Sequence, residues 1–342
     1  MGKTKAIALL SGGLDSLLAV VVMKKLDVDV TALTFLTHFG CDITDRSSCS
    51  TDQTLNAEKY GFTIKHAHLG EKFINIVMNP EYGHGKNMNP CLDCRILMLK
   101  EAGEFMRMTE ADFIVTGEVL GQRPMSQRRD TFSIIDKKSG LKGLILRPLS
   151  AKRLKPTIPE IKGLVNREKL YDFAGRSRKP QIALAREFGL TDLPTPAGGC
   201  LLTDPIYSKR LKDLLNNTSS PDIDDFSLLR LGRHFRVSQS TKIIIGRNEN
   251  ENKQIIQSAK QTDYLICVTR YGSPVTLIRG EDRDRFIYTA GASCARYTSA
   301  RDLPSVEVAV FQGSMDDQSF LYNLNVEPAM DEELSDIRIG GQ

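Results

Sequence analysis

A six-residue glycine turn near the start of the chain constrains its fold more than any other stretch. It reads Ser11-Gly12-Gly13-Leu14-Asp15-Ser16. The apolar run 6–10 precedes it and the apolar, helix-compatible run 17–25 follows it, which predicts a strand, a tight turn and a helix. Paired glycines let a backbone approach an anion closely, and the N–H groups that open a helix point at the same oxygens. The stretch therefore indicates a pyrophosphate site; a plain strand-to-helix turn, with Asp15 as a helix cap, is the alternative.

The stretch is not a Walker loop, because no Gly-Lys-Ser/Thr ending follows its glycines. Its pattern, Ser-Gly-Gly-x-Asp-Ser, resembles the PP-loop of the ATP pyrophosphatases. The resemblance implies an α/β fold with a doubly wound parallel sheet of the adenine nucleotide α-hydrolase-like type. It also implies that ATP is cleaved between its α and β phosphates and that a carbonyl oxygen is adenylated. The residues that it assigns to the phosphates and magnesium of ATP are Ser11, Gly12, Gly13, Asp15 and Ser16.

The length of 342 residues exceeds what one ordinary core holds together, so two domains are expected. We expect a PP-loop catalytic domain over 1–205, a linker over 206–222, and a smaller α+β domain with an acidic tail over 223–342. No apolar run reaches membrane length and the N-terminus does not resemble a signal peptide, so no membrane partner is expected. A cytoplasmic location follows, where the seven cysteines are more typical of thiols or metal ligands than of disulfides.

The segment after the first predicted helix, 29–35, has the pattern of a second strand. In a doubly wound sheet the carboxyl end of such a strand flanks the adenine, so Thr34 and Phe35 are candidates for contact with the nucleoside. Further along, the sequence predicts a helix over 50–60, a strand over 62–69, a helix from 71 and a strand from 113.

Three cysteines form the second informative pattern. Cys91 and Cys94 follow Pro90, which favours a helix start, and they lie one turn apart at its positive end, where the thiol pKa is expected to be lowered. A Cys-x-x-Cys pair by itself fits a redox pair, half a zinc site or part of an iron-sulfur site. Cys200 follows Gly198 and Gly199, and a third thiolate would leave one position of a 4Fe-4S cluster open.

The stretch Thr116-Gly117-Glu118-Val119-Leu120-Gly121-Gln122, with Ser126-Gln127, the Leu-Arg-Pro-Leu run 146–149 and Lys152, carries a closer resemblance. It resembles the catalytic domain of the tRNA 4-thiouridine synthase (tRNA uracil sulfurtransferase) family over about residues 3–205. The Asn-Pro-Cys-x-x-Cys element also resembles the tRNA 2-thiouridylases. These resemblances imply that ATP adenylates a uridine carbonyl of tRNA and that sulfur displaces AMP, with 4-thiouridine favoured over 2-thiouridine. They place Gly117 and Gln122 beside the nucleotide.

The resemblance also assigns chemistry to the thiols. Cys91, Cys94 and Cys200 correspond to the three ligands of a 4Fe-4S cluster that holds sulfide, with Asp15, Cys94 and Cys200 as the catalytic residues. In other members two cysteines relay a persulfide through a disulfide, and Cys94 and Cys200 are then the matching pair. The expected partners are tRNA and a sulfur donor, either inorganic sulfide or a cysteine desulfurase; a homodimer is left open. An enzyme that adenylates a small molecule for sulfur or amide transfer is the alternative.

Basic residues concentrate in one block of the chain. The segment 121–180 holds sixteen Lys and Arg against five acids, which favours contact with a polyanion such as RNA over a merely solvated face. Downstream, the sequence predicts strands over 243–245 and 264–269 and a helix over 252–259, in a domain that resembles the RNA-binding domain of the NFACT proteins. There, His234 and Arg247 are further candidate phosphate contacts and Phe235 a stacking platform, with a plain scaffold domain as the alternative. The candidate RNA contacts are Arg123, Arg128, Arg129, Lys152, Arg153, Arg233 and Arg236.

Overall fold

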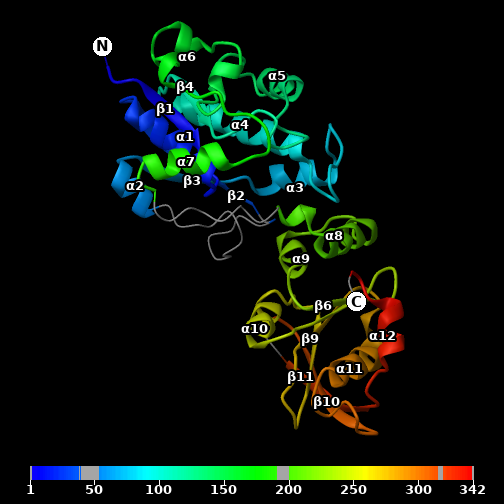
Figure 1. The fold of residues 1–342 in the computed structure, drawn as a ribbon. Helices are drawn as coiled ribbons and strands as arrows, with labels where there is room; N and C mark the ends of the chain where they lie inside the picture. The colour runs from blue at the N-terminus through cyan, green and yellow to red at the C-terminus, as the bar shows by residue number, and fades with distance from the viewer. Residues whose placement is uncertain (1, 38, 40–53, 191–199, 315–318, 341–342) are drawn as a thin grey trace. The chain divides into compact units, whose positions relative to one another are not determined.

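The computed structural model describes residues 2–37, 39, 54–190, 200–314 and 319–340. It divides into two compact units, Met1–Thr203 and Asp204–Gln342, each of which is described by itself (Figure 1). Among the described residues, none of the helices combines the length and apolarity that crossing a bilayer needs. The division after Thr203 lies two residues before the end expected for the catalytic domain.

The first unit contains a five-stranded parallel sheet in the order β3-β2-β1-β4-β5. Its strands are β1 Lys5–Leu9, β2 Asp29–Leu36, β3 Thr63–His68, β4 Phe113–Thr116 and β5 Ile145–Leu146. The chain leaves β1 toward β2 on one side and returns to β4 on the other, so the strand order reverses at β1. Leu9 is paired with both Leu33 and Thr116, which brings the loops after β1 and β4 and the end of β2 to one edge of the sheet. Ligands of open α/β sheets bind at such an edge.

Helices cover both faces of this sheet, as the alternation of strands and helices predicts. Helix α1, Leu14–Lys25, is buried from Leu14 to Met23 apart from Asp15, and packs with α7, Lys179–Glu187, over one face. Helix α4, Cys91–Met108, lies against β1 and β4 and also contacts α3 and α5. The remaining helices of this unit are α2 Thr54–Tyr60, α3 Gly70–Met78, α5 Arg129–Lys138 and α6 Ile158–Ile161. The predicted doubly wound α/β fold is confirmed.

The second unit contains a six-stranded antiparallel sheet in the order β11-β10-β8-β9-β7-β6. One apolar cluster packs between its strands and helix α11, and another packs between the sheet and α9 and α10. Its strands are β6 Arg233–Arg236, β7 Lys242–Ile245, β8 Tyr264–Val268, β9 Thr276–Arg279, β10 Val306–Gln312 and β11 Ser319–Val326. Its helices are α8 Pro205–Asn217, α9 Ile223–Leu228, α10 Glu249–Gln257, α11 Ile287–Arg296 and α12 Asp331–Ile337. The predicted smaller α+β domain is confirmed.

One assignment at the edge of this unit needs correction. The expected linker 206–222 is mostly helix α8, because Asp204 caps the helix by accepting the N–H of Tyr207 at 2.7 Å and Leu211 and Leu214 bury its apolar face. The acidic tail contains β11 and α12, most of whose residues are exposed. Its acids open α12, where they complement the positive end of a helix, and β11 pairs along β10.

Candidate active site

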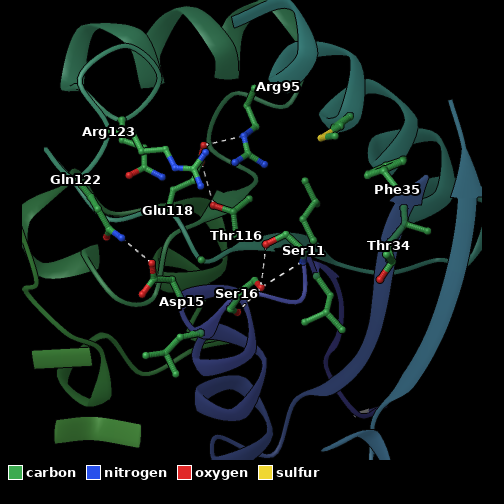
Figure 2. Close-up of a pocket in the computed structure, with 18 of the residues that line it drawn as sticks. Ser11, Asp15, Ser16, Thr34, Phe35, Arg95, Thr116, Glu118, Gln122 and Arg123 are labelled. Carbon is green, nitrogen blue, oxygen red and sulfur yellow. Dashed lines mark hydrogen bonds and ion pairs between the residues drawn. The ribbon is translucent and has the colours of Figure 1, made fainter. Parts of the chain in front are cut away.

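A cavity of about 260 Å³ opens at the edge of the parallel sheet where β1, β2 and β4 end (Figure 2). The PP-loop forms one side, the end of β2 contributes Thr34 and Phe35, and the loop after β4 contributes Gly117 and Gln122. Each predicted nucleotide residue except Gly12 therefore lines one cavity, which is large enough for part of a nucleotide. Its lining residues are Leu9, Leu10, Ser11, Gly13, Leu14, Asp15, Ser16, Leu33, Thr34, Phe35, Arg95, Met98, Thr116, Gly117, Glu118, Gln122, Arg123, Gln127 and Arg178.

The PP-loop is held in shape by its own hydroxyl groups. Gly12 has φ 73°, a left-handed conformation that glycine adopts without strain. Ser16 Oγ donates to the carbonyl of Gly13 at 2.8 Å and accepts from the backbone N–H of Ser11 at 3.2 Å. The N–H groups of the first turn of α1 therefore face the cavity from a rigid turn, which is the arrangement that binds phosphate oxygens.

Two acidic residues, Asp15 and Glu118, line the cavity, and Asp15 belongs to the PP-loop. Gln122 Nε2 donates to Asp15 Oδ2 at 2.7 Å, while the buried Oδ1 of Asp15 has no hydrogen-bond partner among the described residues. Burial raises the pKa of Asp15, and the Gln122 hydrogen bond and the charges of Arg178 and Arg123 oppose that shift. An orphaned carboxylate oxygen beside a phosphate cradle fits magnesium, which binds through one or two carboxylates together with substrate phosphates.

Gly117 lies where the loop after β4 crosses the PP-loop. A Cβ at this position would stand 2.4 Å from the carbonyl oxygen of Asp15 and 2.5 Å from the nitrogen of Ser16, and both of these are backbone atoms that cannot move aside cheaply. Only glycine lets the two loops approach this closely. Gly117 thus lines the cavity and also has a structural role, because it allows the loop after β4 to pack against the PP-loop.

Replacing Gly117 by Ala is expected to displace the PP-loop and to weaken ATP binding strongly. Overpacking of this kind costs on the order of 1–3 kcal/mol of folding stability, and thermal unfolding with and without ATP measures both effects. Gly272→Ala is the matched control, because an added Cβ there meets nothing within 4 Å. Unchanged stabilisation of Gly117→Ala by ATP would show that the close approach has no importance for the site.

Sequence reasoning missed Arg95, Met98 and Glu118, which also line the cavity. Arg95 and Met98 come from the first two turns of α4, so the helix that begins with Cys91 also forms a wall of the cavity. Glu118 is only 2% exposed and pairs with Arg95 at 3.1 Å and with Arg147 at 3.0 Å. The sequence signal that could have identified Arg95 was its position directly after Cys94 on a predicted helix.

One of the predicted thiols, Cys94, contacts a residue of the cavity wall. Cys94 Sγ is 4.0 Å from Met98 Sδ, and Met98 lines the cavity. The exposed Cys200 precedes the short 3₁₀ turn Leu201–Thr203. That turn is bound to the segment before α4, because the Met88 N–H donates to the Leu202 carbonyl at 3.1 Å and Asn87 Nδ2 donates to the Thr203 carbonyl at 2.7 Å. The segments that carry the predicted thiols are therefore adjacent, while Gly198 and Gly199 lie outside the described residues.

Within the part of the chain that the structure describes, the thiol side chains do not form a metal site. No three His, Cys, Asp or Glu side chains within the described ranges converge closely enough to hold a metal ion. The expected lowering of a thiol pKa is wrong for Cys91, because burial raises it and the charges of Arg123 and Arg95 only partly oppose that shift. As the described side chains lie, the three cysteines do not converge as ligands of the predicted 4Fe-4S cluster.

The basic residues of 121–180 have separate environments. Arg123 lines the cavity. Arg128, which is 64% exposed, occupies the position just before α5, and Arg129 is the first residue of that helix. Lys152 Nζ donates to the Glu168 carbonyl at 2.8 Å and Arg153 Nε to the Asp172 carbonyl at 2.7 Å, although both side chains stay accessible.

The predicted RNA contacts on β6 are largely overturned. Phe235 is fully buried in the core and cannot stack on a base, and His234 is fully buried with Nε2 at 2.8 Å from the Leu231 carbonyl. Burial holds the pKa of His234 well below its ordinary value, so it offers no positive charge. Arg236 is bound to Asp213 by two hydrogen bonds, at 3.0 and 2.5 Å.

Two further arginines of this region are engaged within the unit. Arg247 pairs with Glu251 at 2.6 Å, and Arg233 lies over the ring of Tyr297 at 4.2 Å. The alternative of a scaffold strand therefore describes β6 better than a phosphate-binding strand does.

Comparison with known proteins assigns both units to families of domains. Residues 2–161 match the family model described as thiamine biosynthesis protein (ThiI). The first unit carries a ThiI-family domain. Residues 232–337 match the model of the NFACT protein RNA binding domain. The PP-loop and every residue that lines the cavity except Arg178 lie within the match to the ThiI model, and β6 to β11 lie within the match to the NFACT model.

Several curated proteins are similar to the ThiI-family domain. A bifunctional protein NifU/MnmA of Rubrobacter xylanophilus is 33% identical over 112 residues, which are 31% of this chain and 23% of that protein. A tRNA-specific 2-thiouridylase MnmA of Herpetosiphon aurantiacus is 28% identical and covers 61% of this chain and 58% of its own. A probable tRNA sulfurtransferase of Thermococcus kodakarensis is 31% identical and covers 42% and 36%. The chain thus spans less than two thirds of the length of these relatives.

The similarity to solved structures is weaker than that to the curated proteins. A crystal structure of a 4-thiouridine synthetase–RNA complex with bound ATP is 19% identical, covers 56% of this chain and 51% of that one, and has a TM-score of 0.35. The C-terminal part of the fibronectin/fibrinogen-binding protein of Streptococcus suis is 14% identical, covers 72% and 90%, and has a TM-score of 0.27.

Proposed function

We propose that this protein is an ATP-dependent tRNA sulfurtransferase that replaces a uridine carbonyl oxygen by sulfur. One observation carries the proposal: helix α4 begins with the Cys-x-x-Cys pair and also supplies Arg95 and Met98 to the cavity that the PP-loop lines. One helix thus carries the thiol pair and also lines the nucleotide cavity, which supports an enzyme that activates a carbonyl with ATP and then delivers sulfur. The match of residues 2–161 to the ThiI family supports the same chemistry.

In the first step the uridine carbonyl oxygen attacks the α-phosphorus of ATP, and pyrophosphate leaves. The N–H groups at the start of α1 and the hydroxyl of Ser11 would hold the phosphates, and Asp15 would hold magnesium, which neutralises charge on the phosphates. Thr34 and Phe35, at the end of β2, would contact the nucleoside. The step turns a poor leaving group, the carbonyl oxygen, into AMP.

In the second step a sulfur nucleophile attacks the activated carbon, and AMP leaves with the former carbonyl oxygen. We propose that the sulfur arrives as a persulfide on Cys94 or Cys200, the two thiols whose segments are joined through Met88 and Leu202. The thiolate takes the outer sulfur from the persulfide of a cysteine desulfurase, whose own thiolate leaves; inorganic sulfide would need an added oxidant to form the same persulfide. The partner thiolate then attacks the sulfur that remains bonded to the enzyme, which releases thiouridine and forms a disulfide. An external thiol must reduce that disulfide before the next turnover. Position 4 of uracil is favoured over position 2.

Nucleoside analysis tests the proposal as a whole. Purified protein, ATP, magnesium, a cysteine desulfurase with cysteine as the sulfur donor, and a reducing thiol are expected to convert uridine to thiouridine in tRNA, with one AMP released for each sulfur inserted. Mass spectrometry of the digested tRNA distinguishes 4-thiouridine from 2-thiouridine. AMP release that depends on a small molecule and not on tRNA would favour the alternative, an enzyme that activates a small molecule.

Transfer RNA binding is proposed to be largely electrostatic. The exposed Arg128 and its neighbour Arg129 belong to the basic block, and the NFACT-type domain supports RNA as the partner. We expect the log of the RNA association constant to fall steeply and linearly with the log of salt concentration. Arg128→Ala with Arg129→Ala should reduce the slope by about two units, because each lost phosphate contact releases about one counterion less.

Filter binding over a salt series measures that slope. Lys100→Ala is the matched control, since Lys100 is an exposed cation of α4 outside the basic block. A salt-independent affinity, or an unchanged slope in the double variant, would contradict contact between this surface and RNA.

A further inference from the structure

Three arginines line the cavity, and they divide into two groups. Arg123 and Arg178 act on Asp15, since their positive charges favour its ionised form. Arg95 is on another wall, formed by α4, where its Nε pairs with Glu118 at 3.1 Å. The cation on the α4 wall is therefore not needed to balance Asp15.

A buried network fixes the direction of Arg95. Glu118 accepts from Thr116 Oγ1 and from Arg147 Nε, each at 3.0 Å. The nitrogens Nη1 and Nη2 of Arg147 bind Asp136 at 3.0 and 2.7 Å. The guanidinium of Arg147 also lies 4.0 Å from the centre of the Phe132 ring. Because the buried Glu118 is held by Thr116 and by Arg147, and Arg147 in turn by the partly exposed Asp136, Arg95 is paired with a well-anchored carboxylate.

The free end of Arg95 is directed into the cavity. Only its Nε is used by Glu118, and among the described residues its two Nη nitrogens form no hydrogen bond. Its side chain is 23% exposed, and Figure 2 shows it reaching toward the space above Ser11 and Thr116. Two parallel donors on a partly desolvated arginine match the geometry of a phosphate.

We infer that Arg95 binds the α-phosphate, which becomes the phosphate of the adenylate and then of the leaving AMP, and that Glu118 is its positioning residue. This inference rests on the proposed binding of ATP in the same cavity. The pyrophosphate belongs to the PP-loop and the nucleoside to the end of β2, so the α-phosphate between them faces the remaining wall. Arg95 directly follows Cys94 in the chain, so the group proposed to steady the leaving AMP is on the helix that carries one of the two thiols proposed to handle the sulfur.

Calorimetric titration of the full chain with AMP and with adenosine tests the inference without RNA or a sulfur donor. Arg95→Ala should weaken AMP binding about 10- to 100-fold and leave adenosine binding unchanged, because only AMP carries the phosphate. Arg95→Lys should restore part of the loss. Arg107→Ala, an exposed arginine in the last turn of the same helix, should bind both ligands like the wild type.

Glu118→Gln tests the positioning role. It should weaken AMP binding less than Arg95→Ala does, and the double variant should be no weaker than Arg95→Ala alone, because both changes act through one contact. Equal losses for AMP and adenosine would mean that Arg95 is only structural, and no loss would overturn the inference. If the wild type binds neither ligand, the nucleotide site and the role of Arg95 both fail; if AMP discrimination holds without tRNA thiolation, only the proposed function fails.

Discussion

Asp15→Asn is expected to abolish ATP turnover, with a fall in the rate of AMP release of at least about 10²- to 10³-fold, the size seen when one charge-stabilising group is lost. The substitution keeps the shape of the side chain and its contact with Gln122 but removes the negative charge that would hold magnesium. The unpartnered Oδ1 is the reason to expect so large an effect, since no other group of the described residues uses that oxygen. Chromatographic measurement of AMP in the presence of tRNA and magnesium gives the rate.

The matched control for this experiment is Asp27→Asn. Asp27 lies just beyond the other end of the same helix, its side chain is 89% exposed, and its ion pair with Lys3 is on the surface. Surface pairs of this kind contribute little to stability, so the control should turn over ATP like the wild type. Normal AMP release by Asp15→Asn would remove Asp15 from the metal and nucleotide chemistry altogether.

Cys94→Ser and Cys200→Ser are each expected to reduce tRNA thiolation to background while ATP binding persists. Serine keeps the size of the side chain but forms no persulfide, so the sulfur is not delivered although the carbonyl can still be adenylated. Thiouridine is quantified by mass spectrometry and ATP binding by calorimetry. Cys267→Ser is the control, because Cys267 lies on β8 of the other unit and has no place in the chemistry.

The behaviour of Cys91 separates the two sulfur routes. A persulfide relay predicts that Cys91→Ser stays active and that anaerobically purified protein is colourless and free of iron. The predicted 4Fe-4S cluster requires instead that all three cysteine variants lose iron, absorbance near 400 nm and activity together. Full thiolation by Cys200→Ser would contradict both routes.

Local sequence patterns were enough to predict much of the nucleotide site. The PP-loop turn depends on Gly12 and on hydroxyls within six residues of one another, so its conformation was predictable from neighbours in the chain. The strands on either side were predictable for the same reason, because fully buried parallel strands such as β4 are short apolar runs. The doubly wound order then follows from the alternation of strands and helices.

The side chains of β6 show where such patterns fail. The sequence Arg-His-Phe-Arg suits both an exposed basic strand and a core strand whose ends carry arginines. Pairing of Phe235 with Ile243, and packing of α11 against the sheet, decide that the middle of the strand is buried. Burial also removes the charge of His234, a consequence that no local pattern carries.

The sequence alone determined that the chain has a phosphate-binding turn between β1 and α1, a Cys-x-x-Cys helix start, and two domains of different sheet type. Only the tertiary structure decided that α4 and that turn line the same cavity, and that Arg95, paired with Glu118, is part of the cavity wall. It also decided that the segment after Cys200 is bound to the segment before Cys91. The physical reason is the range of the interactions involved. Turn conformation and helix starts depend on adjacent residues, whereas a site is assembled by contacts such as that of Asn87 with Thr203, which join residues 116 positions apart.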